Sequence, residues 1–443
     1  MNKKLSLFMA LVMTASLFVG CGKGGANNKD SASKGDTIKI GLDYELSNDV
    51  ATYGQGLVTG IEMAFKEIND AGGVLGKKVE LIKADNKSDT AEAANVASKL
   101  ATRDKVVAIL GPATSGSVKA AIPQATQNKV PLISASATAD DVTIDSHGKV
   151  RDYVFKTCFS DSFQGVILAN FAVKDLKSKN AAVLIDTTSD YSKGLSKSFK
   201  ETYSKLGGKV VTEQAYQAKD KDFKAVLTNI KNAKPDLLYL PGYYEEVGLI
   251  VKQARELGLN VPILGGDGYD SPKLTELAGK EALNNVYYTN HYSSKDTSAN
   301  VVRFIDAFKK QFNKEPNAFN ALGYDLAYFI ADALKRAGEP DREKLKEALA
   351  STKDFKGITG QLSIDKNHNP VKSITILEVK NGEPTFLKKQ QPKDRVQRTE
   401  DRGQRTEDRA QRIEDSYGCF SDLIITEKLK LKIFSNGMEK NYP

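Results

Sequence analysis

The chain has 443 residues, 40% of them hydrophobic and 27% charged, which is typical of a globular protein with two or three domains. Its 64 Lys and Arg residues are interleaved with 56 Asp and Glu residues, and this balance argues against a surface dedicated to nucleic acid. The three cysteines form no CxxC pair and the three histidines show no ligand spacing, so we predict neither a disulfide framework nor a metal site.

Residues 1–20 have the layout of a signal peptide. Lys3 and Lys4 precede an apolar run of about 15 residues, which is too short to span a bilayer comfortably. The run ends in LFVGC, which resembles the lipobox of bacterial lipoproteins, although Phe18 stands where Leu is usual. We therefore expect a lipid on Cys21, a flexible linker over 21–36 and an extracytoplasmic, lipid-anchored protein; the alternative is an ordinary secretory signal with an incidental Cys.

From residue 37 onward, strand and helix patterns alternate. Strands are expected at 37–42, 77–85, 106–110 and 130–136, with helices at 53–73 and 90–104 and another beginning after residue 117. The rhythm restarts after Phe155, with strands at 181–186, 209–216, 235–242 and 261–266 and helices at 191–208, 223–233 and 246–259. Buried, Val/Ile/Leu-rich strands alternating with helices indicate parallel α/β sheets, and the restart predicts two Rossmann-like lobes in tandem.

Four of the strand ends carry the sequences GPATSGS, SASATADD, PGYYEE and GGDGYD. Ligands of doubly wound sheets bind beyond the carboxyl ends of the strands, so we expect these segments to share a site. GPATSGS, residues 111–117, leads from a strand into a helix, where N–H groups and the helix dipole favour an anion. The anion could be a phosphate, a developing oxyanion or a carboxylate.

The residue types favour the carboxylate of an amino acid. The segment lacks the Lys of a phosphate loop and the GxGxxG fingerprint, and Ser115 lies in no GxSxG elbow with a His base. The Ser115 hydroxyl and loop N–H groups can hold a carboxylate, whereas Asp267, Thr138 and a carbonyl of Ser136 or Ala137 can accept from an ammonium group. Aromatic residues for an apolar wall follow other strand ends or begin helices: Tyr53, Tyr191, Tyr243 and Phe319.

Several segments together resemble the branched-chain amino-acid (Leu/Ile/Val-type) solute-binding proteins of ABC importers, over about residues 37–392. They include ILGPATSGS, PLISASATADDVT, FKTCFSDSFQG, DYSKGL and GYDLAYFIADAL. The resemblance implies the type I periplasmic-binding-protein fold: two Rossmann-like lobes with parallel sheets, joined by three crossovers near residues 155–157, 287–291 and 359–362. Lobe one would comprise 37–156 and 290–360, and lobe two 157–289 and 361–392.

The resemblance also implies roles for individual residues. Ser115 would hold the ligand carboxylate; Ser136, Ala137, Thr138 and Asp267, where relatives also have Glu, would hold its ammonium group; Thr114, Tyr53, Tyr191, Tyr243 and Phe319 would line the side-chain pocket. It further implies a monomer that is no enzyme, needs no cofactor, closes over an amino acid and docks on a membrane permease driven by a separate ATPase. Two alternatives stay open: a ligand-sensing protein for an amide or aromatic acid, and a hydrolase using Ser115.

The last segment, 393–443, breaks with this pattern. It contains three seven-residue units beginning at Asp394, Asp401 and Asp408, but their apolar positions are nearly empty, unlike those of a coiled coil. A segment of mixed positive and negative residues with few apolar residues is typical of disorder or of a solvated helix. We expect an appendage without a role in ligand binding.

Overall fold

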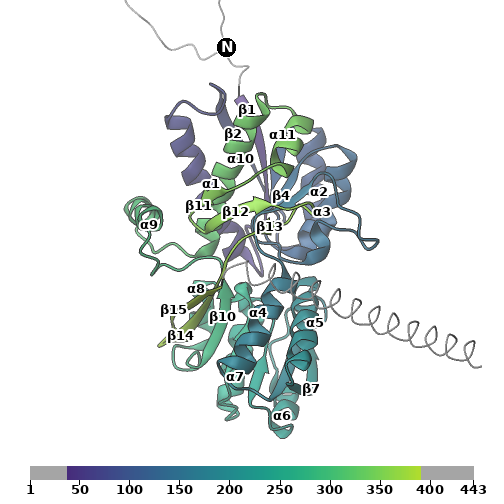
Figure 1. Ribbon diagram of the computed structural model, residues 1–443, viewed down its shortest axis with the longest axis vertical. Helices are drawn as coiled ribbons and strands as arrows, with labels where there is room; N and C mark the ends of the chain where they lie inside the picture. Colours follow the sequence, from purple (N-terminus) through teal and green to yellow (C-terminus); the bar gives the residue numbers. More distant parts are fainter. Residues whose placement is uncertain (1–36, 391–443) are drawn as a thin grey trace, which may run out of the picture. The chain divides into compact units, whose positions relative to one another are not determined.

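The computed structural model describes residues 37–390, and strands alternate with helices through most of that stretch (Figure 1). The expected signal peptide, the lipidation site Cys21, the linker and the repeat tail lie outside the described residues. None of the helices within 37–390 combines the length and apolar character needed to cross a membrane.

The first sheet has five parallel strands in the order β2-β1-β3-β4-β5. These are β1 (Thr37–Tyr44), β2 (Lys78–Asp85), β3 (Ala108–Leu110), β4 (Leu132–Ser134) and β5 (Val154–Lys156). Helices α1 (Ala51–Asp70) and α10 (Ala318–Ala337) pack together on one side, as Figure 1 shows, and α2 (Thr90–Thr102) packs with α3 (Ser115–Gln127). Alternation along β3 explains both layers, because Ala108 and Leu110 join the cluster of α1 whereas Ile109 joins that of α2 and α3. We call this sheet with its helices the first lobe.

The second sheet has seven strands in the order β15-β14-β10-β9-β8-β6-β7. The parallel strands are β6 (Asn180–Asp186), β7 (Lys209–Tyr216), β8 (Leu237–Tyr239), β9 (Ile263–Gly265) and β10 (Val286–Asn290). An antiparallel edge, β14 (Ile374–Lys380) and β15 (Glu383–Gln390), extends this sheet. Its helices are α4 (Asp161–Lys174), α5 (Asp190–Lys205), α6 (Lys224–Asn232), α7 (Tyr244–Glu256) and α8 (Pro272–Ala278). We call this sheet with its helices the second lobe.

The chain passes between the two sheets three times within the described residues. It leaves the first sheet after β5, and it leaves the second after β10 to form α9 (Ala299–Phe312), α10 and α11 (Arg342–Ala350). A small sheet of β11 (Phe355–Gly357), β12 (Gly360–Ile364) and β13 (Pro370–Val371) follows, and the chain returns between β13 and β14. This return lies beyond the 359–362 expected for the third crossover, because β12 pairs with β11 and β13 rather than with the second sheet.

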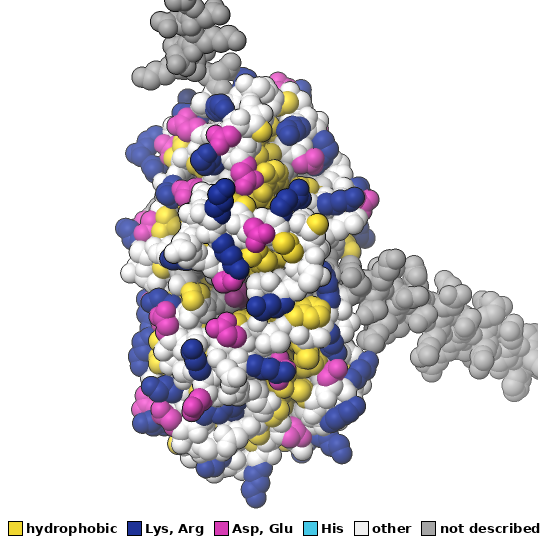
Figure 2. Space-filling model, turned by 90° about the vertical axis from the view of Figure 1, so that its left-hand side faces the viewer, with side chains coloured by type: hydrophobic (Ala, Val, Ile, Leu, Met, Phe, Trp, Pro, Cys, Tyr) yellow, Lys and Arg dark blue, Asp and Glu magenta, His cyan; other side chains and the backbone are white. Residues whose placement is uncertain are grey.

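Surface charge is mixed. On the face that Figure 2 shows, Lys and Arg side chains alternate with Asp and Glu, and no single sign forms a continuous field there. Most of the ion pairs join partly exposed side chains, such as Lys83 with Glu62 and Lys66 with Asp70. Exposed pairs of this kind contribute little to stability, so the two hydrophobic layers of each lobe hold the fold together.

Candidate functional site

The loop after β3 begins the site, and its first amide groups are already occupied. Ala113 donates its backbone N–H to Oε2 of Glu45 at 2.9 Å, and Thr114 donates its N–H to Oε1 at 3.1 Å. Glu45 is fully buried at the end of β1. The close approach of the two strands requires Gly111, whose φ is +101° and where a Cβ would lie 2.1 Å from the Asp43 carbonyl oxygen. Two of the loop N–H groups that could hold a ligand carboxylate are therefore already bonded within the protein.

The serine and threonine residues of the first lobe gather between this loop and the end of β4. Ser136 Oγ donates to the Ala113 carbonyl at 2.8 Å, and Ser115 Oγ accepts from the Ala139 N–H at 3.1 Å. The Ser115 hydroxyl hydrogen therefore stays available as a donor, and α3, which Ser115 begins, has no side-chain cap. Thr138 Oγ1 is buried beside the Asp161 carboxyl group, and neither Thr138 Oγ1 nor Asp161 Oδ2 has another hydrogen-bond partner among the described residues.

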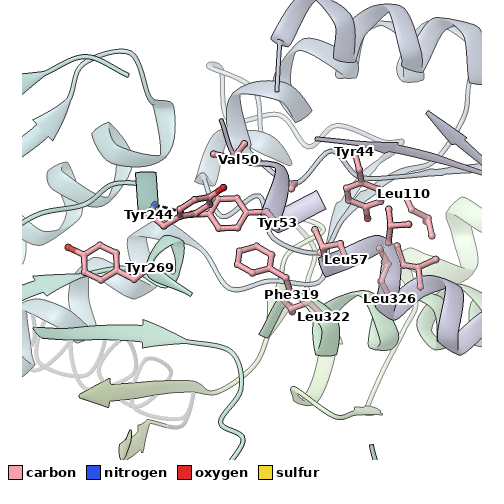
Figure 3. Packing of buried hydrophobic residues seen from close by; sticks show 14 of the residues in the cluster. Tyr44, Val50, Tyr53, Leu57, Leu110, Tyr244, Tyr269, Phe319, Leu322 and Leu326 are labelled. Atoms are coloured by element: carbon pink, nitrogen blue, oxygen red, sulfur yellow. Dashed lines mark hydrogen bonds between the residues drawn. The ribbon is translucent and has the colours of Figure 1, made fainter. Parts of the chain in front are cut away.

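The aromatic residues come from both lobes and meet one another. Tyr53 on α1 stacks on Phe319 of α10 with 4.3 Å between ring centroids, and its edge meets Tyr243 at 5.7 Å. Tyr191 on α5 stacks on Tyr243 at 5.0 Å. Figure 3 shows the Tyr53 and Tyr244 rings meeting with Phe319 beside Tyr53. The Tyr53 hydroxyl donates to the Gly268 carbonyl, so this side chain joins the first lobe to the second.

A small cavity lies between these groups. Its lining comprises Tyr53, Ala113, Thr114, Ser136, Tyr191, Tyr243, Asp267, Gly268 and Phe319. Seven of the ten predicted ligand-contact residues are in this lining, whereas Ser115, Ala137 and Thr138 are buried beside it. The cavity measures about 10 Å³, far below the roughly 300–1,000 Å³ of ordinary ligand pockets. An amino acid can therefore enter only if the lobes or the aromatic side chains move apart.

Asp267 has three donors, all from the second lobe or its crossover. It lies in the short 3-10 helix η2 (Asp267–Tyr269), and only 5% of its surface is exposed. Its Oδ1 accepts from Tyr191 Oη at 2.9 Å and from Gln164 Nε2 at 3.0 Å. Its Oδ2 lies 3.0 Å from Nε2 of His291. Gln164 and His291 were not predicted as site residues, and the one signal for Gln164 is its place in FKTCFSDSFQG.

A second buried acid lies beside Asp267. Gln164 Nε2 is 3.4 Å from Oδ1 of Asp161, so one amide group contacts both carboxyl groups. Burial raises the pKa of Asp161 well above its ordinary value, and the nearby Asp140 and Asp267 raise it further. Burial lowers the pKa of His291 to about 4, although Asp267 acts in the opposite direction. The Thr138 hydroxyl and the buried Lys156 act on Asp161 in the opposite direction, and they lower its pKa.

Two ion pairs between the lobes involve residues close in sequence to the cavity residues Tyr191 and Tyr53, and we call them the rim pairs. Lys119 on α3 pairs with Asp190 at the start of α5, with Nζ and Oδ2 at 2.9 Å, and also with Asp141 at 2.5 Å. Lys219 pairs with Asp49 at 3.1 Å. Polar contacts thus flank the aromatic cluster on the outside, where solvent reaches them.

Comparisons with known proteins agree with this architecture. A family model described as periplasmic binding protein matches residues 37–384. The leucine-, isoleucine-, valine-, threonine- and alanine-binding protein of Pseudomonas aeruginosa is 33% identical over 332 residues, which are 75% of this chain and 86% of that protein.

Solved structures agree as well. A leucine-binding protein of Thermotoga maritima has 38% identity and a TM-score of 0.76, covering 81% of this chain and 99% of its own. A branched-chain amino-acid transporter substrate-binding protein of Streptococcus pneumoniae, solved with isoleucine, has 42% identity and a TM-score of 0.75. That match covers 79% of this chain and 99% of the other.

Proposed function

Because the chain belongs to the type I periplasmic-binding-protein family that includes the Leu/Ile/Val-binding proteins, we propose that it captures a branched-chain or related amino acid for an ABC importer. The family consists of binding proteins, so the prediction that the chain is not an enzyme is confirmed and the hydrolase alternative falls. The observation that carries the proposal is the buried Asp267, a carboxylate in the lining of a cavity whose other walls are aromatic and hydroxyl groups.

We infer that the two ends of an α-amino acid contact different polar groups around this cavity. Asp267 and the Thr138 hydroxyl oxygen would accept from the ammonium group, together with a carbonyl of Ser136 or Ala137. Ser115 donates its free hydroxyl hydrogen to the carboxylate, at the uncapped start of α3, where the helix dipole favours negative charge.

The ligand side chain would then lie against the aromatic wall, which is formed by Tyr53, Tyr191, Tyr243 and Phe319. A wall of this kind suits an apolar side chain, because contact with the rings removes hydrocarbon surface from water. Thr114 sets the depth of the pocket, and Glu45 holds it in place through its hydroxyl at 2.9 Å.

Capture would proceed by closure of the lobes. The ligand would first contact the loops after β3 and β4 in the first lobe. Rotation about the crossovers then brings Tyr191, Tyr243 and Asp267 of the second lobe over it. A ligand stabilises the closed form only by the contacts that it gains there, so the residues of the second lobe decide how strongly closure follows binding.

The remaining parts of the proposal concern location and partners. A lipid on Cys21 would hold the mature chain at the outer face of the cell membrane, with 22–36 as a tether. The closed form would then dock on a membrane permease whose ATPase is a separate subunit. Replacement of Cys21 by Ser should release the protein from the membrane fraction, and retention there would contradict the lipid anchor.

Calorimetric titration of the purified protein with L-leucine, L-isoleucine and L-valine tests the central proposal. We expect Asp267→Asn to weaken binding about tenfold to several hundredfold, because a charged partner is lost in a buried site. Glu276→Gln, an exposed acid on α8, is the control and should bind as the wild type does. Wild-type binding of benzoate or an amide, without binding of any α-amino acid, would overturn the proposal in favour of the alternative ligand class.

A further inference from the structure

His291 connects the proposed ligand site with the crossovers between the lobes. It directly follows β10, at the start of the second crossover, and its side chain is 1% exposed. Its ring stacks on Phe159 of the first crossover, with 3.7 Å between centroids and 10° between planes. Its Nε2 lies 3.0 Å from Oδ2 of Asp267. One imidazole therefore contacts both crossovers and the acidic group of the cavity.

The hydrogen-bond pattern fixes the direction of this contact. Asp267 already accepts from Tyr191 and Gln164, and an ionised carboxylate can only accept. His291 therefore donates through Nε2–H, which leaves Nδ1 without hydrogen, and Nδ1 has no partner among residues 37–390. The low pKa of about 4 agrees with a neutral ring at neutral pH. A neutral donor leaves the charge of Asp267 intact for a cation.

His291 is also the one donor that the described residues place at Oδ2. The two other donors both contact Oδ1, so without His291 the buried Oδ2 lacks a partner and the carboxylate plane is free to turn about χ2. Such a turn displaces the oxygen that faces the cavity. The His291 ring is held by stacking on Phe159. It therefore cannot move with the Asp267 carboxylate, and its hydrogen bond to Oδ2 opposes rotation of that carboxylate about χ2.

We propose that His291 is a positioning residue for ammonium recognition, which holds the Asp267 carboxylate in its binding orientation from the crossover between the lobes. This inference rests on the proposed function, in which Asp267 accepts from the ammonium group of an amino acid. It assigns to His291 no contact with the ligand itself. The effect of His291 must therefore depend on Asp267 and on the presence of an ammonium group in the ligand.

Two variants separate this role from simple packing. His291→Gln keeps an N–H donor near the position of Nε2, whereas His291→Leu keeps bulk but cannot donate. We expect H291L to weaken L-leucine binding at least tenfold, and H291Q to recover most of that loss. The affinity for 4-methyl-2-oxopentanoate, which has the leucine carbon skeleton but no ammonium group, should change less than threefold in both.

A double-mutant cycle with Asp267→Asn completes the test. In the D267N background, H291Q and H291L should bind leucine equally, because the orientation of an uncharged amide no longer matters to the ammonium group. A loss that persists in that background, or that is equal for leucine and the oxo acid, would overturn the positioning role. If H291L fails to fold, H291Q is compared with its parent in the wild-type and D267N backgrounds. A loss of leucine affinity that is the same in both backgrounds does not depend on Asp267 and contradicts the proposal.

The outcomes also distinguish this inference from the proposed function. If the wild-type protein binds no α-amino acid, both the proposed function and the positioning role of His291 are contradicted. A wild-type protein that binds leucine, with H291L and H291Q equal to it, removes the positioning role alone.

Discussion

Thr114 donates both its backbone N–H and its hydroxyl to the same oxygen of Glu45, at 3.1 and 2.9 Å. A carboxylate of the protein thus occupies the place that a strand-to-helix loop usually offers to an external anion. The ligand carboxylate is left with Ser115 and the first turn of α3. The Glu45 carboxylate therefore fixes the loop conformation and leaves fewer loop N–H groups for a ligand carboxylate.

Removal of this carboxylate should destabilise the first lobe. Glu45→Ala leaves the buried N–H of Ala113 and both donors of Thr114 without their acceptor, and we expect the free energy of unfolding to fall by about 2–4 kcal/mol. Urea denaturation followed by circular dichroism measures this change. Glu62→Ala removes an exposed acid paired with Lys83 and should cost less than about 0.5 kcal/mol. Equal losses in the two variants would show that the loop does not depend on Glu45.

Tyr53 offers a test of closure. Its hydroxyl contacts the Gly268 carbonyl in the other lobe and also lies 3.4 Å from the Tyr244 N–H. Tyr53→Phe removes these contacts but keeps the stacking on Phe319, so leucine should bind about five- to thirtyfold more weakly. Tyr203→Phe is the matched control, because the Tyr203 hydroxyl bonds to Ser178 within one lobe. Affinity that is unchanged in Y53F would mean that this contact forms equally well without ligand.

The rim pair of Lys119 and Asp190 should contribute less, and in a salt-dependent way. Their side chains are 29% and 33% exposed, so solvent screens the attraction between them. Lys119→Gln should weaken leucine binding up to about fivefold in low salt. The difference from wild type should disappear in 1 M NaCl, where the Debye length is about 3 Å. A difference that survives high salt would point to a role for Lys119 other than charge pairing.

The repeat tail should be dispensable for binding. Strand β15 ends at Gln390, so a chain that stops after Pro392 keeps every helix and strand that the structure describes. We expect its affinity for leucine to lie within twofold of that of the full chain in the same titration. A larger loss would assign the tail a part in the site or in closure.

The sequence allowed the sheets and most of the residues around the cavity to be predicted, because both follow from local patterns. The alternation of strands and helices indicates parallel sheets, and each parallel sheet places its strand ends at one edge. Thr114 and Ser136 follow strands of the first sheet, Asp267 follows β9 of the second, and all three line one cavity. The partners Glu45, Gln164 and His291 could not be found in this way. Each contacts its partner across a long sequence separation, and only the distances in the folded chain select it from many similar side chains.

The antiparallel edge of the second sheet was missed for a related reason. Strand β14 is almost entirely buried and β15 is largely exposed, and nothing in the local sequence states which sheet they join. Pairing of β14 with β10 decides this, and β10 is distant in sequence. The third crossover consequently lies nearer the end of the chain than expected.

The buried imidazole also makes stability depend on pH. The pKa of His291 falls from an unfolded value of 6.5 to about 4 in the folded protein, chiefly through burial, with Asp267 opposing and Lys372 adding to the fall. Between pH 6.5 and 4 the unfolded chain therefore binds more protons at this residue, and the free energy of unfolding decreases as the pH is lowered through that window.

From pH 7 to pH 5 this residue alone should lower the free energy of unfolding by about 2 kcal/mol. His291→Gln does not titrate, so urea denaturation at the two pH values should show a decrease smaller by about that amount than in wild type. The exposed His147 is the control, and H147Q should show the wild-type difference. Equal decreases in wild type and H291Q would mean that His291 keeps its ordinary pKa in the folded protein, because such a ring adds no pH dependence.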